Sequence, residues 1–231
     1  GGVYREVELF ETPQTVIRDL FLYLDDDGIH VEAAVDGPAT QAKLAIPRLD
    51  LATTLTLTNG RAQTILQAQP DLWSPENPVL YDVTLSAGGD SVGDRVGFRR
   101  IERRGTRILL NGQPVFLRGI SVHEDDELQG KLTSEADIRR RFAHARELGC
   151  NFLRLAHYPH HEMAARIADE MGLMLWEEIP VYWAVDFTNS ATRHDAENQL
   201  CELIRRDRNR ASVIIWSVGN ENPDTDAPVS Y

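Results

Sequence analysis

The sequence predicts two folded parts of different class in one chain, an antiparallel β-sandwich followed by an α/β part built on a parallel sheet. Residues 12–98 contain short runs of alternating apolar and polar residues, separated by Gly, Pro, Asp and Asn. After Gly105 the pattern changes to apolar strands that alternate with amphipathic helices. With 231 residues, 42% hydrophobic and 26% charged, the chain is long enough for two modest cores, so disorder is not expected.

The strands of the first part are expected in the runs VIRDLFLYL, IHVEAAVDG, AKLAI, TTLTLTNG and VLYDVTLSAGG. In the second run, residues 29–35 alternate between apolar and polar side chains, which is typical of a strand with one buried face. About seven such segments favour a sandwich of immunoglobulin type, here without the cysteine pair of antibody domains. Asp25, Asp26 and Asp27 before Gly28 are predicted to form a solvated turn, with a calcium site as the alternative.

The second part opens with RILLNGQPVFLRG, in which Asn111 and Gly112 stand between two apolar runs. An Asn-Gly pair in that setting predicts a β-hairpin. The second arm, residues 115–120, is predicted to be the first strand of the parallel sheet. Ser134 and Asp137 then resemble a capping box, so a helix is expected to begin there.

That helix places Ile138, Phe142 and Ala145 on one face, so it is expected to cover an apolar surface. The cycle of strand and helix then repeats, with strands predicted at residues 152–156, 173–178 and SVIIWSV, and helices at 161–171 and 195–208. Strands this apolar with helices between them imply a parallel sheet covered by helices. Because a complete (β/α)8 barrel needs about 250 residues, we expect the first four βα units of a truncated TIM barrel.

The charge and the cysteine content exclude several function classes. The chain has 36 acidic and 24 basic residues and a net charge of -12, so binding to nucleic acid or to a membrane surface is not expected. No apolar run reaches the length of a membrane span. Cys150 and Cys201 are too few for a disulfide framework and are predicted to be buried, unpaired thiols. The start lacks the pattern of a signal peptide, which leaves the compartment open.

The polar residues that follow the predicted strands are candidates for chemistry, because reactive groups of a parallel βα barrel lie at the C-terminal ends of its strands. These residues are Ser121, His123, Glu124 and Asp125; His157 and Tyr158; Glu177, Glu178 and Trp183; and Asn220 and Glu221. We expect them to converge on one rim.

Two long motifs occur in this part, NFLRLAHYPHHEMAARIADEMGLMLW at residues 151–176 and DRNRASVIIWSVGNE at residues 207–221. Both resemble motifs of glycoside hydrolase family 2, the second being similar to its acid/base segment. GFRRIERRGTRILLNGQPVFLRGISVHED resembles the family's junction between sandwich and barrel, LWSPENPVLY the end of the sandwich, and GGVYREVEL the end of its N-terminal sugar-binding domain. The resemblance implies the end of that domain at residues 1–11, an immunoglobulin-like sandwich at 12–98 and the N-terminal half of the catalytic barrel at 99–231.

The resemblance also implies roles for individual residues. Glu221 matches the general acid/base, and Asn220 matches a residue that binds the 2-hydroxyl of the sugar. His123 and His157 match positions that contact the substrate, with hydrogen bonding within the barrel rim as the alternative. Arg154 matches the arginine that holds the nucleophile. No cofactor and no metal are expected.

For several rim residues more than one role stays open. Trp183 is interpreted either as a platform on which a sugar stacks or as loop packing. Glu177 and Glu178 could bind a metal, but no Glu-x-His follows them as in magnesium-binding β-galactosidases, so one of them is expected to form hydrogen bonds within the barrel mouth. His160 and His161 are predicted to lie on the surface where a helix begins.

The expected activity is that of a retaining β-galactosidase or β-glucuronidase that cleaves terminal β-glycosides by double displacement, with a carbohydrate as partner. Leu155 and Ser121 depart from residues frequent in the family, which bears on specificity more than on reaction class. The chain starts with glycine, so both ends are expected to be cuts in a longer protein, a homo-oligomer.

The family's nucleophile lies near the end of the seventh strand, and no residue here is assigned to that role. The isolated chain is therefore hypothesised to be inactive. The alternative is a non-catalytic carbohydrate-binding or scaffold fragment.

Overall fold

The computed structural model describes residues 3, 5–128, 130–131, 133–183 and 185–222. It divides the chain into two compact units, residues 1–115 and 116–231, which are described separately below. The predicted domain ranges also include residues 1–2, 4, 129, 132, 184 and 223–231, which lie outside the described residues. The boundaries at residues 11 and 98 stay predictions.

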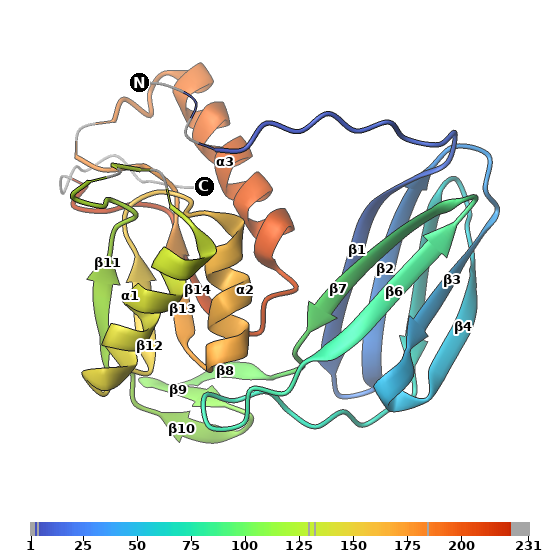
Figure 1. The fold of residues 1–231 in the computed structure, drawn as a ribbon, viewed down its shortest axis with the longest axis horizontal. Helices are drawn as coiled ribbons and strands as arrows, with labels where there is room; N and C mark the ends of the chain where they lie inside the picture. The colour runs from blue at the N-terminus through green and yellow to red at the C-terminus, as the bar shows by residue number, and fades with distance from the viewer. Residues whose placement is uncertain (1–2, 4, 129, 132, 184, 223–231) are drawn as a thin grey trace. The chain divides into compact units, whose positions relative to one another are not determined.

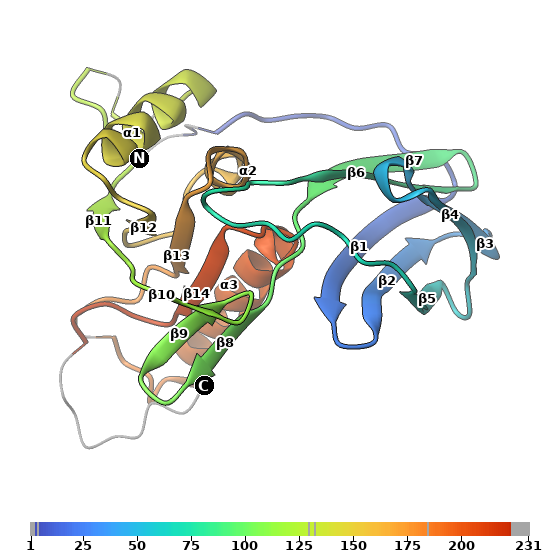
Figure 2. The ribbon, with the colours of Figure 1, turned by 90° about the horizontal axis from the view of Figure 1, so that it is seen from below.

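The first unit contains a sandwich of two antiparallel sheets (Figures 1 and 2). One sheet has the order β1-β2-β5 and the other β4-β3-β6-β7. The strands are β1 (Val16–Asp25), β2 (Gly28–Asp36), β3 (Gln41–Ile46), β4 (Leu51–Thr56), β5 (Arg61–Leu66), β6 (Tyr81–Ala87) and β7 (Asp90–Val96). The seven strands confirm the number predicted from the apolar runs, all of which lie in the described range 12–98.

The alternation read from the sequence decides which side chains fill the core of this sandwich. In β2 the side chains of Ile29, Val31, Ala33 and Val35 are all buried and belong to one apolar cluster with residues of both sheets. The intervening polar side chains are partly or fully exposed. Residues 25–28 form the tight turn from β1 to β2, which confirms the predicted solvated turn.

A three-stranded antiparallel sheet follows, made of β8 (Ile101–Arg104), β9 (Arg107–Leu110) and β10 (Gln113–Val115). Asn111 and Gly112 join β9 to β10 with φ of 54° and 78°, as a turn of type I′ requires, so the predicted hairpin is confirmed. The predicted strand over residues 115–120 is wrong. Instead, β10 ends at Val115, and the separate strand β11 (Gly119–Val122) starts the parallel sheet.

The connection before β11 leaves both sheets because a side chain takes over its backbone hydrogen bonds. Asn151 accepts a hydrogen bond from the Arg118 amide at 2.8 Å and donates one to the Phe116 carbonyl at 3.0 Å. A continuous strand would have used these groups in a ladder. The predicted strand at residues 115–120 therefore covers two elements with different partners, since β10 pairs with β9 and β11 pairs with β12.

The second unit is built on the parallel sheet β11-β12-β13-β14. Its other strands are β12 (Phe152–Leu155), β13 (Met174–Glu178) and β14 (Val213–Ser217), and its helices are α1 (Glu135–Glu147), α2 (Glu162–Met171) and α3 (Ser190–Asp207). Helices α1 and α2 cover one face of the sheet (Figure 1), and Phe142 of α1 and Ile167 of α2 are buried there with Leu153, Leu155 and Leu175.

The helix ends follow local capping rules. Ser134 and Asp137 form the predicted capping box of α1, and α2 ends at Gly172 with φ of 67°. Helix α3 begins at Ser190, capped by Asn189, and not at Asp195 as predicted. Asn189 accepts a hydrogen bond from the Ala191 amide at 2.9 Å. The cap of α3 is therefore Asn189, which lies before the predicted start at Asp195.

Both cysteines are free, as predicted. Their predicted burial is wrong: Cys150 is half-buried, and Cys201 is exposed on α3, of which only Ala196, Leu203 and Asp207 are buried. In the part of the chain that is described, no helix combines the length and the apolar character needed to cross a membrane.

Candidate active site

The parallel sheet presents chemically different faces because side chains alternate along each strand. Leu153, Leu155 and Leu175 are buried against the helices. Arg154 and Glu178 alternate with them in β12 and β13 and so face the opposite side of the sheet. Because the strands are parallel, the residues that follow each strand lie at one end of this unit.

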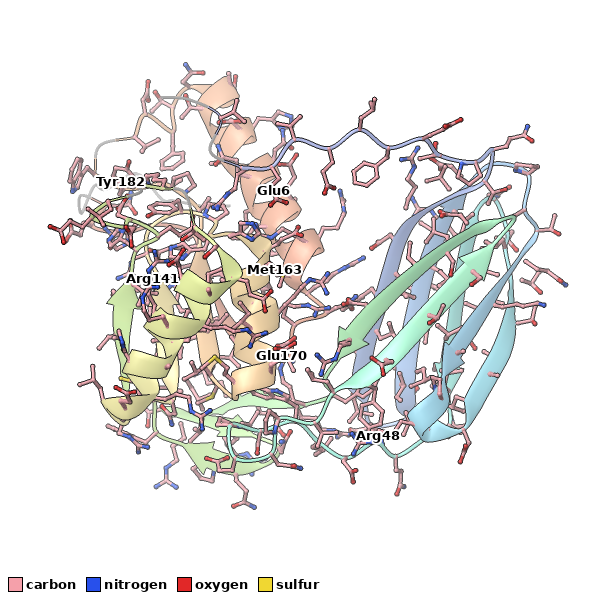
Figure 3. All side chains as sticks on the ribbon, in the orientation of Figure 1. Glu6, Arg48, Arg141, Met163, Glu170 and Tyr182 are labelled. Carbon is pink, nitrogen blue, oxygen red and sulfur yellow. The ribbon has the colours of Figure 1, made fainter. Side chains whose placement is uncertain are left out.

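A hollow of ≈ 290 Å³ lies at this end of the sheet. It is lined by His123, His157, Tyr158, Tyr182, Trp183, Asn220 and Glu221. Tyr182 marks the place in Figure 3, at the end toward which the arrows of the parallel strands point in Figure 1. The strand-end rule therefore brings six predicted rim residues to one pocket, where Tyr182 joins them.

Glu178 lies behind the pocket wall with its side chain fully buried, at 0% exposure. Its Oε2 accepts hydrogen bonds from Arg154 Nε at 3.1 Å and Nη2 at 2.8 Å. Its Oε1 lies 2.5 Å from His157 Nδ1. This confirms that one of the two consecutive glutamates forms hydrogen bonds at the strand ends.

Arg154 connects this buried carboxylate to the pocket. Besides its bonds to Glu178, Arg154 Nη2 donates to Asn220 Oδ1 at 2.8 Å, and its guanidinium lies over the ring of Trp176, 4.8 Å from the ring centre. Side chains from β12 and β13 and from the segment after β14 are thus joined in one network.

Glu221 lies in the last part of the chain that is described, next to the loop after β13. Asn220 donates its backbone N–H to the Val181 carbonyl at 2.8 Å, which pairs the two loops. The indole Nε1 of Trp183 donates to Glu221 Oε2 at 3.1 Å. The Trp183 ring is 65% exposed and meets the Tyr182 ring edge-on, 5.3 Å between centres. Both predicted roles therefore stay open, and the structure adds a hydrogen bond to Glu221.

Trp183 and Glu221 also share an uncommon backbone conformation. Their φ values are 59° and 50°, in the left-handed region that residues other than glycine rarely occupy. Such residues gather at functional sites, where surrounding structure holds them in place. The pairing of the two loops supplies that support.

The histidines of the pocket contact each other and Tyr158. The rings of His123 and His157 meet edge to face with centres 5.3 Å apart, and His123 Nδ1 lies 3.3 Å from the Tyr158 hydroxyl. The Lys131 ammonium lies over the Tyr158 ring at 3.9 Å. The pocket therefore has an aromatic wall beside its polar residues.

The predicted surface position of His160 is wrong. His160 is 5% exposed, its Nε2 lies 2.9 Å from the Ala156 carbonyl, and its ring stacks on Tyr158. The chain turns back on itself before α2, which buries this ring. His161 does stand at the helix entry, where its Nδ1 caps α2 by accepting from the Met163 amide.

Glu177 points the other way from Glu178 and is 2% exposed. Burial, and then the charge of Asp207, raise the pKa of the Glu177 carboxyl well above its ordinary value, and Arg206 opposes this. Burial also raises the pKa of Asp207, again against Arg206, which forms an ion pair with it. The raised pKa favours the protonated form of Glu177, which lies in the layer between sheet and helices and does not line the pocket.

Most of the predicted site residues thus come together. Glu221, Asn220, His157, His123 and Trp183 line the pocket, and Arg154 holds Asn220 from behind. Their catalytic and binding roles stay predictions.

Sequence reasoning missed Tyr182, although it directly precedes Trp183, and assigned no role to Tyr158. Over the described residues, no group of three or more His, Cys, Asp or Glu side chains is arranged to hold a metal ion.

Comparison with known proteins identifies the family. The model of the TIM barrel domain of glycosyl hydrolases family 2 matches residues 101–228, more than half of the chain, and a second model of the same family matches residues 17–99. A β-galactosidase of Pseudoalteromonas haloplanktis is 29% identical over 96% of this chain and 24% of its own length. A β-glucuronidase of Rattus norvegicus is 30% identical over 100% of this chain and 38% of its own length.

Solved structures agree with these matches. A structure of β-glucuronidase 3 from Bacteroides uniformis superposes with a TM-score of 0.82 at 29% sequence identity, covering 98% of this chain and 31% of that one. The chain thus spans about a quarter to two fifths of the length of these relatives. The sandwich corresponds to one domain of the family and the parallel sheet to the start of its TIM barrel, and the chain belongs to glycosyl hydrolases family 2.

Proposed function

We propose that this chain is part of a retaining glycoside hydrolase that cleaves terminal β-glycosides, with Glu221 as general acid/base. The observation that carries the proposal is the pocket at the ends of the parallel strands, in which the Glu221 carboxylate lies beside Asn220, His157 and three aromatic side chains. Ligand sites of parallel βα barrels lie at this end of the sheet.

The size and lining of the pocket fit one sugar ring. Its ≈ 290 Å³ is at the lower end of the roughly 300–1,000 Å³ typical of small-molecule sites, so it holds a single terminal residue more readily than a glycan chain. Aromatic faces pack against the C–H groups of a sugar, while Asn220 and the histidines offer hydrogen bonds to its hydroxyls.

The proposed reaction has two steps. Glu221 donates its proton to the glycosidic oxygen, a carboxylate nucleophile attacks the anomeric carbon, and the alcohol departs, leaving a glycosyl ester. Water then attacks the same carbon while Glu221 takes up its proton, so the sugar leaves with its original anomeric configuration. Asn220 binds the 2-hydroxyl, and Arg154 keeps Asn220 in place.

The nucleophile in this proposal comes from residues outside the chain. A retaining mechanism needs a second carboxylate about 5–5.5 Å from the acid/base. Glu178 does not present one, because Arg154 and His157 occupy its oxygens and the side chain is fully buried. The matched relatives are several times longer than the matched part, which leaves room for such a residue.

The sugar is proposed to be a β-galactoside or a β-glucuronide, since similar proteins carry both names. The test is to assay the complete natural polypeptide that contains this chain against nitrophenyl β-galactoside, β-glucuronide, β-glucoside and β-mannoside. Turnover of the first or second with the other two much slower is expected. Binding of a sugar without turnover would favour the alternative of a non-catalytic carbohydrate-binding module.

The role of Glu221 has a separate test in the dependence on the leaving group. In Glu221→Gln, a substrate whose alcohol needs protonation should lose about 10²–10⁴-fold in rate, whereas a dinitrophenyl glycoside should lose much less in its first step. Glu202→Gln, on the exposed side of α3, is the matched control and should behave as wild type. Equal losses on both substrates would contradict the acid/base assignment.

A further inference from the structure

We propose that Glu178 is a positioning residue that orients two sugar-binding side chains at once, His157 directly and Asn220 through Arg154. This inference rests on the proposed function, and it assigns a task to a carboxylate that never touches the sugar. It concerns only the second unit, within residues 154–220.

Because Glu178 is fully buried, its charge must be compensated by the residues around it. A carboxylate removed from water costs several kcal/mol unless hydrogen bonds and a counter-charge replace its hydration. Arg154 supplies a counter-charge through two donors, and His157 supplies a third contact. An apolar residue of similar volume would avoid this cost, so specific orientation is the property that the carboxylate adds.

The contact with His157 decides which ring nitrogen carries a proton. Glu178 forms an ion pair with Arg154 and accepts two hydrogen bonds from it, so we infer that its other oxygen also acts as an acceptor. The Nδ1 of His157, 2.5 Å away, therefore donates to it. With Nδ1 and the ring plane fixed, Nε2 is the nitrogen left for the pocket, which the His157 ring lines.

The contact with Arg154 reaches the opposite side of the pocket. The same Nη2 that donates to Glu178 at 2.8 Å also donates to Asn220 Oδ1 at 2.8 Å. Because that bond occupies the carbonyl oxygen of the Asn220 amide, its NH₂ group is free to face a sugar hydroxyl. Glu178 thereby defines the direction of both the Asn220 amide and the His157 ring.

A spectroscopic test examines the contact without reference to activity. In one-dimensional proton NMR of the complete natural polypeptide, the Nδ1 proton of His157 should give a far-downfield resonance, as protons shared with a carboxylate do. The resonance should be absent in His157→Gln and lost in Glu178→Gln. It should remain in Glu177→Gln, which changes the neighbouring buried carboxyl on the other face of β13.

A kinetic test then measures the consequence for the sugar. Misplacing substrate-positioning groups by about 1 Å costs on the order of 10²-fold in rate, so Glu178→Gln should lower kcat/KM on a nitrophenyl glycoside about 100-fold. On the matching 2-deoxy glycoside, which lacks the hydroxyl assigned to Asn220, the loss should shrink to about tenfold or less. Glu177→Gln should stay within about twofold of wild type on both substrates.

Each result decides the matter. The downfield resonance together with the smaller loss on the 2-deoxy substrate supports the inference. Absence of the resonance in wild type, its survival in Glu178→Gln, or equal losses on both substrates would overturn it, the last because a general loss of folding affects both substrates alike. If wild type turns over none of the glycosides, the proposed function fails, and the NMR result still decides whether Glu178 orients His157.

Discussion

Replacing Glu177 by Gln is expected to change how the stability of the β13–α3 region depends on pH. Glu177 is buried next to Asp207, and burial and that charge raise the pKa of its carboxyl well above the ordinary 4.5. Glutamine has nearly the same shape as the neutral acid but cannot ionise. The variant therefore keeps the packing between sheet and helices and removes one titration.

The sign and size follow from proton linkage. Between pH 4.5 and the raised pKa, the folded state holds one more proton at Glu177 than the unfolded state does. The contribution of Glu177 to the opening free energy of the β13–α3 region is therefore largest below pH 4.5. It falls by about 1.4 kcal/mol for each pH unit as the pH rises toward the folded pKa. Glu177→Gln lacks this fall and is more stable than wild type near neutral pH.

Hydrogen–deuterium exchange of peptides from β13 and α3, corrected for intrinsic exchange, measures the opening free energy at several values between about pH 5 and 7. Wild type should lose protection across this range relative to Glu177→Gln. The exposed Glu202→Gln on α3 is the control and should follow wild type. Parallel curves for wild type and Glu177→Gln would contradict a raised pKa of the Glu177 carboxyl.

Two further variants test local interactions. Ser134→Ala removes the α1 cap and should cost about 1 kcal/mol, seen as faster amide exchange in residues 134–140. Hydrogen bonds from Ser134, with help from Arg140, lower the pKa of Asp137 from 3.8 to about 2. The stabilisation that the ionised Asp137 adds should therefore be present above pH 3.8 and lost as the pH falls through about 2. Trp183→Phe keeps an aromatic ring but removes the donor to Glu221. It should lower kcat/KM about threefold to tenfold, less than a buried charged hydrogen bond would imply, because the indole is 65% exposed. If Trp183→Phe keeps the wild-type kcat/KM and only Trp183→Ala loses activity, the aromatic ring and not the hydrogen bond to Glu221 is what matters.

Local patterns predicted the elements well wherever the signal lies in the residues themselves. The alternation in β2, the Asn111-Gly112 turn and the Ser134 capping box all depend on neighbours in the chain, and each is confirmed. The strand-end rule likewise predicted six of the seven residues that line the pocket, although Ser121, Glu124, Asp125, Glu177 and Glu178 do not line it and Tyr182 was missed. It works because parallel strands deliver their following residues to one edge of the sheet.

Some errors arise where a distant group decides, and others where a local turn or cap gives no signal in the residue pattern. The break between β10 and β11 depends on Asn151, far along the chain, which takes the backbone bonds of the connection. The burial of His160 depends instead on a local turn before α2, in which the Ala156 carbonyl and the Tyr158 ring contact its side chain. No pattern in the sequence distinguishes Glu178, which joins two site residues, from Glu177, which faces the helices, until the strand is placed in its sheet.

The most direct test of the acid/base assignment is rescue of Glu221→Ala by azide. Azide needs no general base, so it can replace water in the second step and attack the anomeric carbon of the glycosyl ester. Assayed with a dinitrophenyl glycoside in the complete natural polypeptide, the variant should turn over slowly, accelerate with azide and form the β-glycosyl azide. An α-glycosyl azide, or no response to azide in a folded variant, would contradict Glu221 as the acid/base of a retaining enzyme.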